Sequence, residues 1–372
     1  MKKITPKAEH GRITVPKNTF FGKTAWPSVC RDEKGTLYAV ASSMRLSHVD
    51  PTGKNCMYIS LDDGKTWSKP IVLNDSFADD RDMGITYMGN GRLLVTWFTT
   101  APHDYMDWIA ETDWFDERHK AICGGFSKAW KLLPEDVYKA CNGSYVMISE
   151  NYGISWTDPI RVPVSAPHGP SVCSDGSLIY LGTKAGPSCN KESNVCLYTS
   201  RDGGYTWEYT GGFPNAEDGI STTSMYEPHV IELPNGRLLG AVRVGREKEP
   251  NETVYISFSD DKGKTWSAPK SLETEGIPPQ LMVHSSGAVI LSWCCRINGR
   301  RSERALVSYD NGESWTEDYV INDRCPKDSC DMGYPCTVEM GDGSLFTVYY
   351  QPWPTEGQWS SDLLYTHWNL ED

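Results

Sequence analysis

No long apolar run is present in this sequence. Its apolar stretches fall far short of the roughly 20 residues that a membrane-spanning helix requires. The chain opens with two lysines, but the following ITPKAEHGRITVPKN contains no apolar segment of the kind found in a secretory leader. Without such a leader, its 12 cysteines are typical of reduced thiols in a cytoplasm. We therefore expect a soluble, cytoplasmic protein that has no membrane partner.

Excess positive charge is also missing. The 36 Lys and Arg residues are outnumbered by 49 Asp and Glu residues, which gives a formal net charge of −13. Because nucleic acids attract clustered Lys and Arg, this balance argues against a nucleic-acid partner. The spacings CxxC and HxxxH, which are typical of metal ligands, do not occur. We expect neither a metal centre nor another cofactor.

The sequence does contain one short turn, SxDxGx(T/S)W, that recurs along the chain. An Asp or Ser side chain can bond to the backbone two residues on, and Gly accepts a positive φ without a steric clash. Because these features explain the turn locally, we interpret its acidic residues as structural. The five copies are Ser60–Trp67, Ser149–Trp156 (with Asn151 in place of Asp), Ser200–Trp207, Ser259–Trp266 and Ser308–Trp315.

The five turns form an internal repeat, and a period of roughly 40–50 residues is typical of propeller blades with four short strands. They resemble the Asp boxes of the sialidase-like propellers. The resemblance implies an all-β fold, a six-bladed β-propeller that forms a single domain over residues 1–372. Asp boxes also occur in propellers that are not enzymes, so the turns indicate a fold and leave the chemistry open.

Each predicted blade begins with an apolar strand, a Gly-containing turn and a second apolar strand. The second blade carries a partly helical insertion over residues 101–142, and the last blade lacks an Asp box. Because a propeller must close its ring, we expect the N-terminal GRITV to supply the outer strand of the last blade, next to DLLYTHWNL. The six blades begin near Trp26, Arg81, His168, Glu227, Pro278 and Tyr334.

Polar side chains recur at corresponding positions of different blades. Strands alternate in direction, so the starts of first strands and the ends of second strands lie on the face opposite the Asp boxes. We predict that these side chains converge on a central funnel. The candidates are Arg45, His48 and Asp50; Asp80, Arg81 and Asp82; His168; Glu227 and Arg243; Gln280, Arg296 and Arg304; Tyr334 and Gln351.

Three segments resemble exo-sialidases in detail. EPHVIELPNGRLLGAVR is similar to the segment that supplies the base Glu and a carboxylate-binding Arg, which implies these roles for Glu227 and Arg243. GYPCTVEMGDGSLFTVYY resembles the segment that holds the nucleophilic Tyr, here Tyr334. LYAVASSMRLSHVD resembles the first-blade stretch in which an Arg is followed five residues later by the acid/base Asp, here Arg45 and Asp50.

The implied activity is that of an exo-acting glycoside hydrolase that removes a terminal sialic acid or related acidic sugar with retention. The carboxylate on the anomeric carbon repels an anionic nucleophile, whereas it does not repel a neutral phenol that a neighbouring Glu deprotonates. A buried Asp50 would have a raised pKa and could protonate the leaving oxygen. Arg243, with Arg296 or Arg304, would hold the carboxylate by paired hydrogen bonds.

The first strand departs from this family. Sialidases carry Arg-Ile-Pro there and use the Arg as one of three that bind the sialate carboxylate, but this chain reads Ala25-Trp26-Pro27. Arg81 or Arg45 could substitute, and a different acidic sugar is an equal alternative. Two other hypotheses therefore stay open. They are a hydrolase or lyase that acts on uronic acids, and a non-catalytic propeller that binds glycans or proteins.

Overall fold

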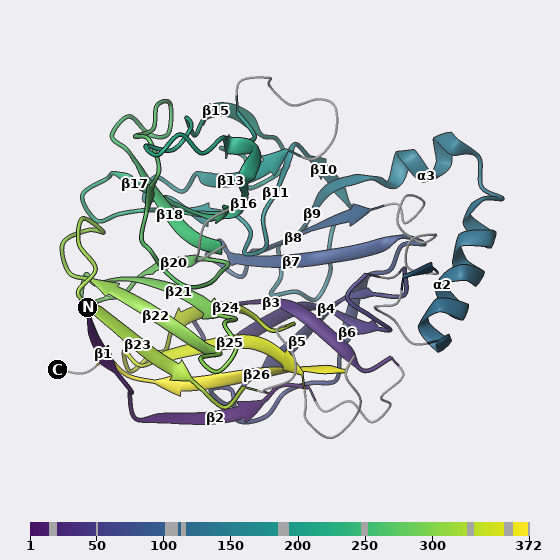
Figure 1. Ribbon diagram of the computed structural model, residues 1–372, viewed down its shortest axis with the longest axis horizontal. Coiled ribbons are helices and arrows are strands. Elements are labelled where there is room, and N and C mark those ends of the chain that lie inside the picture. The colour runs from purple at the N-terminus through teal and green to yellow at the C-terminus, as the bar shows by residue number, and fades with distance from the viewer. Residues whose placement is uncertain are drawn as a thin grey trace.

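In the described part of the chain, the fold consists mainly of β-strands, with helices α2 and α3 at one side (Figure 1). This agrees with the predicted all-β class. The chain is described here by a computed structural model that covers residues 1–14, 21–49, 51–100, 111–112, 117–184, 193–246, 252–325, 331–352 and 360–370.

Most strands belong to antiparallel units of four, which we number one to six in chain order. Unit one contains β3 (Lys23–Arg31), β4 (Leu37–Arg45), β5 (Lys54–Ser60) and β6 (Ile71–Asn74). Unit two contains β7 (Asp79–Tyr87), β8 (Leu93–Thr100), β9 (Gly143–Ser149) and β10 (Ile160–Val162). Unit three contains β12 (Ser171–Val172), β13 (Leu178–Lys184), β14 (Val195–Ser200) and β15 (Glu208–Gly212), and β11 (Val164–Ser165) also pairs with β13.

The second half of the chain repeats this arrangement. Unit four contains β16 (Met225–Glu232), β17 (Leu238–Gly245), β18 (Glu252–Ser259) and β19 (Lys270–Ser271). Unit five contains β20 (Gln280–Val283), β21 (Val289–Cys295), β22 (Ser302–Ser308) and β23 (Glu317–Asn322). Unit six contains β24 (Gly333–Glu339), β25 (Leu345–Pro352) and β26 (Ser361–Trp368).

N-terminal residues complete the last two units. β2 (Ala8–Arg12) pairs antiparallel with β26 and becomes the fourth strand of unit six. β1 (Lys2–Ile4) pairs in parallel with β23 of unit five (Figure 1). The predicted partner of the N-terminal strand is thus confirmed, although the strand comprises residues 8–12 rather than the GRITV segment itself.

Apolar contacts join consecutive units. In the described residues, innermost strands contact those of the next unit, β8 contacts β11, and β24 of unit six contacts β3 of unit one. Buried apolar clusters fill the space between neighbours; one of them joins Val29 and Leu37 of unit one to Phe346 and Val348 of unit six. The alternation of apolar and polar residues in the strands is therefore explained by units that pack face to face.

The Asp-box turns share one set of hydrogen bonds. In the first, Asp62 Oδ1 accepts from the Thr66 amide at 2.8 Å, and the Gly64 amide donates to Ser60 Oγ at 2.9 Å. Trp67 Nε1 then donates to the Gly64 carbonyl at 2.9 Å. Corresponding side-chain bonds recur at Asp202, Asp261, Asp310 and, with an amide in place of the carboxylate, Asn151. These residues are engaged within their own turns, as the sequence predicts.

The insertion of unit two contains α2 (Glu117–Trp130) and α3 (Glu135–Cys141), which lie beside the strands in Figure 1. Trp130 is buried, and its ring centre lies 5.4 Å from that of Phe77. This contact attaches the insertion to the segment between β6 and β7. No helix in the described part of the chain is long and apolar enough to cross a membrane.

Candidate active site

Side chains from all six units line one cavity of about 990 Å³. Its lining includes seven of the residues predicted to converge on a funnel. They are His48, Arg81, Asp82, Glu227, Arg243, Arg296 and Tyr334. Phe98, Thr99, Ser144, Arg161, Pro167 and Tyr226 also line it.

Four of the innermost strands contain a left-handed residue near their start. Trp26, Asp82, Glu227 and Tyr334 have positive φ values of 55°, 53°, 50° and 55°, and the register of each strand shifts at that point. Such left-handed residues cost about 1–3 kcal/mol each, and they concentrate at functional sites. Three of the four precede a proline, which disfavours the right-handed helical conformation. The resulting bulges turn Asp82, Glu227 and Tyr334 into the cavity.

Tyr334 and Glu227 are in direct contact. The Tyr334 hydroxyl donates a hydrogen bond to Glu227 Oε1, and Arg243 Nη1 donates to Glu227 Oε2 at 2.9 Å. Arg243 also forms an ion pair with Glu252 at the start of β18. Burial, together with the carboxylates of Glu227 and Asp82, raises the pKa of Tyr334 well above its usual value. The phenol is therefore protonated at neutral pH and has a carboxylate beside it that can accept its proton.

Two further guanidinium groups belong to the same cavity. Arg296 follows β21, donates from Nε to the Met332 carbonyl at 2.9 Å, and has its guanidinium carbon 5.7 Å from the centre of the Tyr334 ring. The guanidinium carbon of Arg81 lies 4.3 Å from the centre of the Trp26 ring. Backbone and ring contacts thus hold both cations in place.

Asp82 is a buried carboxyl group that forms an ion pair with Arg81, with 3.9 Å between Oδ1 and Nε. Its side chain lines the cavity, the residue is 7% exposed, and Oδ1 has no hydrogen-bond partner among the described residues. Burial raises the pKa of Asp82 to about 7, with the charge of Glu227 adding to the shift and that of Arg81 opposing it. The group can therefore change its charge near neutral pH.

Arg45 is placed away from the cavity. It is fully buried, and its guanidinium forms an ion pair with Asp79 at 2.7 Å and donates to Ser42 Oγ at 2.8 Å. Its other bonds go to backbone carbonyls, including that of His48 at 3.1 Å. The arrangement supports the loop that presents His48. Asp50, the predicted acid/base, lies outside the described residues.

His168 and Gln280 are buried behind the cavity lining. His168 Nδ1 lies 3.1 Å from Ser28 Oγ, and Gln280 Nε2 donates to the Leu281 carbonyl at 3.0 Å. Burial lowers the pKa of His168 well below its usual value, so this imidazole is neutral. His168 thereby connects unit three to unit one, and a second bond of Gln280 Nε2, to the Thr337 carbonyl at 3.4 Å, connects unit five to unit six.

The arginines of unit five lie in different environments. Arg304 is buried, and its Nε donates to Asp318 Oδ1 at 2.9 Å on the side of another cavity. Arg300 pairs with Glu275 at 2.6 Å on the surface. Of the arginines after β21 that the sequence analysis considered, Arg296 alone lines the candidate active site.

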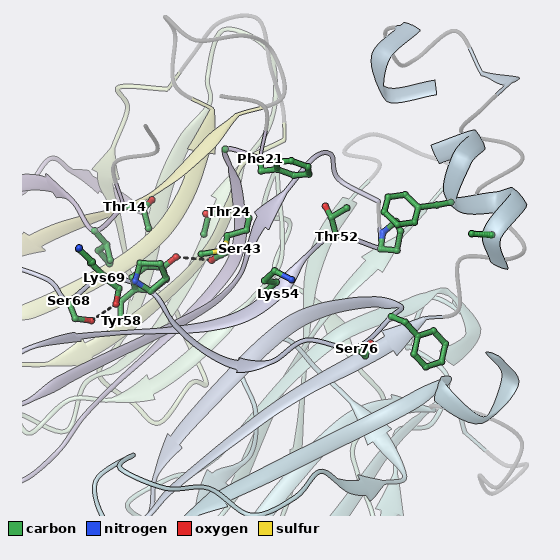
Figure 2. A pocket seen from close by; sticks show the side chains of 18 of the residues that line it. Thr14, Phe21, Thr24, Ser43, Thr52, Lys54, Tyr58, Ser68, Lys69 and Ser76 are labelled. Atoms are coloured by element: carbon green, nitrogen blue, oxygen red, sulfur yellow. Dashed lines mark hydrogen bonds between the residues drawn. The ribbon is translucent and has the colours of Figure 1, made fainter. Parts of the chain in front are cut away.

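A second large cavity of about 1120 Å³ lies between unit one, the N-terminal segment and α2. Figure 2 shows the Tyr58 hydroxyl bonded to Ser43, and the side chains of Phe21, Lys54 and Ser76, which also line the cavity. Apolar side chains of α2, including Phe126 and Trp130, form part of its wall. None of the predicted site residues that the structure describes is among its lining residues.

Sequence reasoning missed three residues that support the cavity. The Trp26 ring packs against the Arg81 guanidinium, Glu252 pairs with Arg243, and Asp331 contacts His48. The residue-proline pairs at the starts of innermost strands were a usable signal for Trp26. Glu252 and Asp331 lie in segments whose partners are set only by the tertiary fold. In the described part of the chain, no group of three or more His, Cys, Asp or Glu side chains is arranged to hold a metal ion.

Known proteins resemble the chain mainly in fold. No curated protein is significantly similar to it. A protein of unknown function from Dyadobacter fermentans has 19% identity and a TM-score of 0.74, over 97% of this chain and 99% of that one. A leech intramolecular trans-sialidase has 16% identity and a TM-score of 0.65, over 97% and 70% of the two chains.

A Fusarium graminearum α-L-arabinofuranosidase also shares the fold, with 13% identity and a TM-score of 0.61, over 98% of both chains. The fold is thus one that glycosidases of different specificity use. Among protein families, the BNR/Asp-box repeat matches residues 58–69, over the first Asp-box turn. The BNR repeat-like domain matches residues 129–361, which is more than half of the chain. The chain therefore belongs to the BNR repeat-like domain family, and it has the sialidase-like fold.

Proposed function

We propose that the six units are the blades of a six-bladed β-propeller whose central funnel is the active site. In support, each unit contacts the next and unit six contacts unit one. N-terminal β2 completes the last unit, which is a common way of closing such a ring. The candidate cavity is lined by side chains of every unit, as a site on the central axis would be.

The proposed activity is exo-acting hydrolysis of a terminal sialic acid or related acidic sugar, with retention through a tyrosyl intermediate. The observation that carries it is the Tyr334–Glu227 hydrogen bond in a cavity that also holds Arg81, Arg243 and Arg296. A phenol with an adjacent carboxylate is an activated nucleophile, and the arginines are suited to a carboxylate-bearing sugar.

In this mechanism Glu227 removes the proton of Tyr334 as the phenolic oxygen attacks the anomeric carbon. Arg243 bonds to the other oxygen of Glu227 and keeps the carboxylate directed at the phenol. Asp50, which the sequence resemblance implies as acid/base, would protonate the leaving oxygen. Arg243 is already paired with two carboxylates, so we assign most of the attraction for the substrate carboxylate to Arg296 and Arg81.

An acidic-glycoside panel tests this function. The protein is incubated with α-sialosides and with uronic-acid glycosides, and products are separated while absorbance in the ultraviolet is recorded. We expect release of free sialic acid or a related acidic sugar, without an unsaturated product. An ultraviolet-absorbing product would indicate a lyase. Binding without release would indicate a non-catalytic propeller, and either result would contradict the proposal.

Asp82 predicts the pH dependence of substrate affinity. Its carboxyl is neutral below its pKa of about 7 and negatively charged above it, where it repels an acidic sugar. We expect KM to rise as the pH increases through this value. The rise is about tenfold if the repulsion weakens binding by the free energy that corresponds to one pKa unit. The Asp82→Asn variant should lose this rise, because the amide stays neutral. The measurement is KM between pH 5.5 and 8.5, and an unchanged profile in Asp82→Asn would refute the assignment.

A further inference from the structure

Asp331 connects three elements beneath the candidate active site. Its Oδ1 accepts hydrogen bonds from the Tyr350 hydroxyl at 2.7 Å and from His48 Nδ1 at 3.0 Å, and its Oδ2 forms an ion pair with Lys23. The Lys23 side chain is 2% exposed and that of Asp331 is 26% exposed, so this ion pair is partly shielded from water. Although burial opposes them, Lys23 and His48 hold the pKa of Asp331 well below its usual range. Asp331 is therefore an ionised carboxylate at neutral pH.

The charge of Asp331 determines which nitrogen of His48 carries the proton. An ionised carboxylate can only accept hydrogen bonds, so the proton lies on His48 Nδ1. Burial lowers the pKa of His48 to about 4, although the neighbouring Asp331 opposes this shift. The imidazole is consequently neutral at pH 7. Its Nε2 carries no proton and can therefore accept a hydrogen bond. Arg81 Nη2 lies 3.4 Å from this nitrogen and donates to it.

Arg81 is thereby fixed from two sides. His48 Nε2 accepts from its guanidinium, and the Trp26 ring lies under it at 4.3 Å. The Trp26 and His48 rings pack edge to face, with centres 5.0 Å apart, so the two supports also hold each other. A flexible arginine loses side-chain entropy when it binds a ligand, and one that is already ordered binds more tightly.

We propose that Asp331 is a positioning residue that acts through His48 to orient Arg81, and that Arg81 takes the place of the arginine missing at Ala25. Ala25 and Arg81 each precede the left-handed residue of their strand, Trp26 in unit one and Asp82 in unit two. They are therefore equivalent positions of adjacent units. The third carboxylate ligand has moved from one unit to the next. This inference rests on the proposed function, since it assigns Arg81 to an acidic sugar.

Kinetics of the Asp331→Asn variant test the role of Asp331. The amide can donate as well as accept, so it no longer fixes the His48 tautomer. Because one charge-assisted hydrogen bond is lost, we expect KM for the acidic glycoside to rise by roughly tenfold. We expect little change in kcat. In an Arg81→Gln background the same change should have no further effect on KM. Asp318→Asn is the matched control, because Asp318 is a buried partner of Arg304 outside the cavity.

A second measurement does not depend on the substrate. Nitrogen-15 NMR of the histidine side chains should show the Nδ1–H tautomer of His48 in the unmodified protein and a mixture of tautomers in Asp331→Asn. An unchanged tautomer, or an equal rise in KM with and without Arg81, would overturn the proposal. If no acidic sugar is turned over or bound at all, the proposed function fails, whereas the NMR result still decides whether Asp331 orients His48.

Discussion

Replacing Tyr334 with Phe is expected to reduce turnover on the order of 10³-fold or more. The change removes the phenolic oxygen that would attack the anomeric carbon and whose proton Glu227 accepts. It leaves the aromatic ring in its buried position, so the protein should fold normally. The measurement is kcat on the glycoside identified in the panel, together with thermal unfolding of both proteins.

Tyr349→Phe provides the matched control for this experiment. Tyr349 lies on β25 of the same unit, is 2% exposed, and bonds to Thr366 Oγ1 at 2.9 Å outside the candidate active site. This variant also loses one buried hydroxyl, but it should retain activity. Full activity in Tyr334→Phe would refute the nucleophile assignment. An equal loss in both variants would show that the effect comes from packing.

Removing Asp79 is expected to destabilise the protein by about 3–5 kcal/mol. Asp79 and Arg45 form an ion pair in which both side chains are 0% exposed. The guanidinium of Arg45 stays charged at any pH that the protein tolerates, so Asp79→Ala leaves a cation buried without its counter-ion. The measurement is the free energy of unfolding in urea, compared with that of the unmodified protein.

The double variant Arg45→Met, Asp79→Leu separates the charge from the packing. It removes both charges at similar volume, and we expect it to recover most of the stability lost in Asp79→Ala. Asp75→Ala is the exposed counterpart, because its pairing with Lys54 is open to solvent, and it should cost less than about 1 kcal/mol. If Asp79→Ala lowered the free energy of unfolding no more than Asp75→Ala, the Arg45–Asp79 ion pair would not be shielded from solvent as described above.

Local chemistry explains which features could be predicted from the sequence. The Asp-box residues bond within their own turns, so the positions of those turns are visible in the sequence. Hairpin turns such as Asn90-Gly91, where both residues have positive φ, mark strand ends in the same way. Glu227 and Tyr334 could be predicted because each begins an innermost strand, a position that converges on one cavity.

The remaining features depend on contacts between side chains of different strands. Arg45 was expected beside the substrate, but its environment is decided by Asp79, which is on β7 of the next unit. Arg304 and Arg296 are similar in sequence context, and only the fold pairs the first with Asp318 and leaves the second at the cavity. Asp331 precedes β24, and its partner His48 belongs to unit one. Periodicity cannot predict such pairings, because it indicates which face of a strand is buried but not which polar side chains meet there.

The N-terminal strands have a consequence for how this molecule is made. β2 precedes the other strands of unit six in the chain, whereas its hydrogen-bond partner β26 follows β24 and β25, so β2 is synthesised long before its partner. Until β26 has been translated, β2 has no partner in unit six, and exposed strand edges of the emerging chain can pair with other chains. Unit six can therefore be completed only after β26 has been translated. Deleting residues 1–12 should therefore lower the yield of soluble protein, although none of these residues lines the candidate active site.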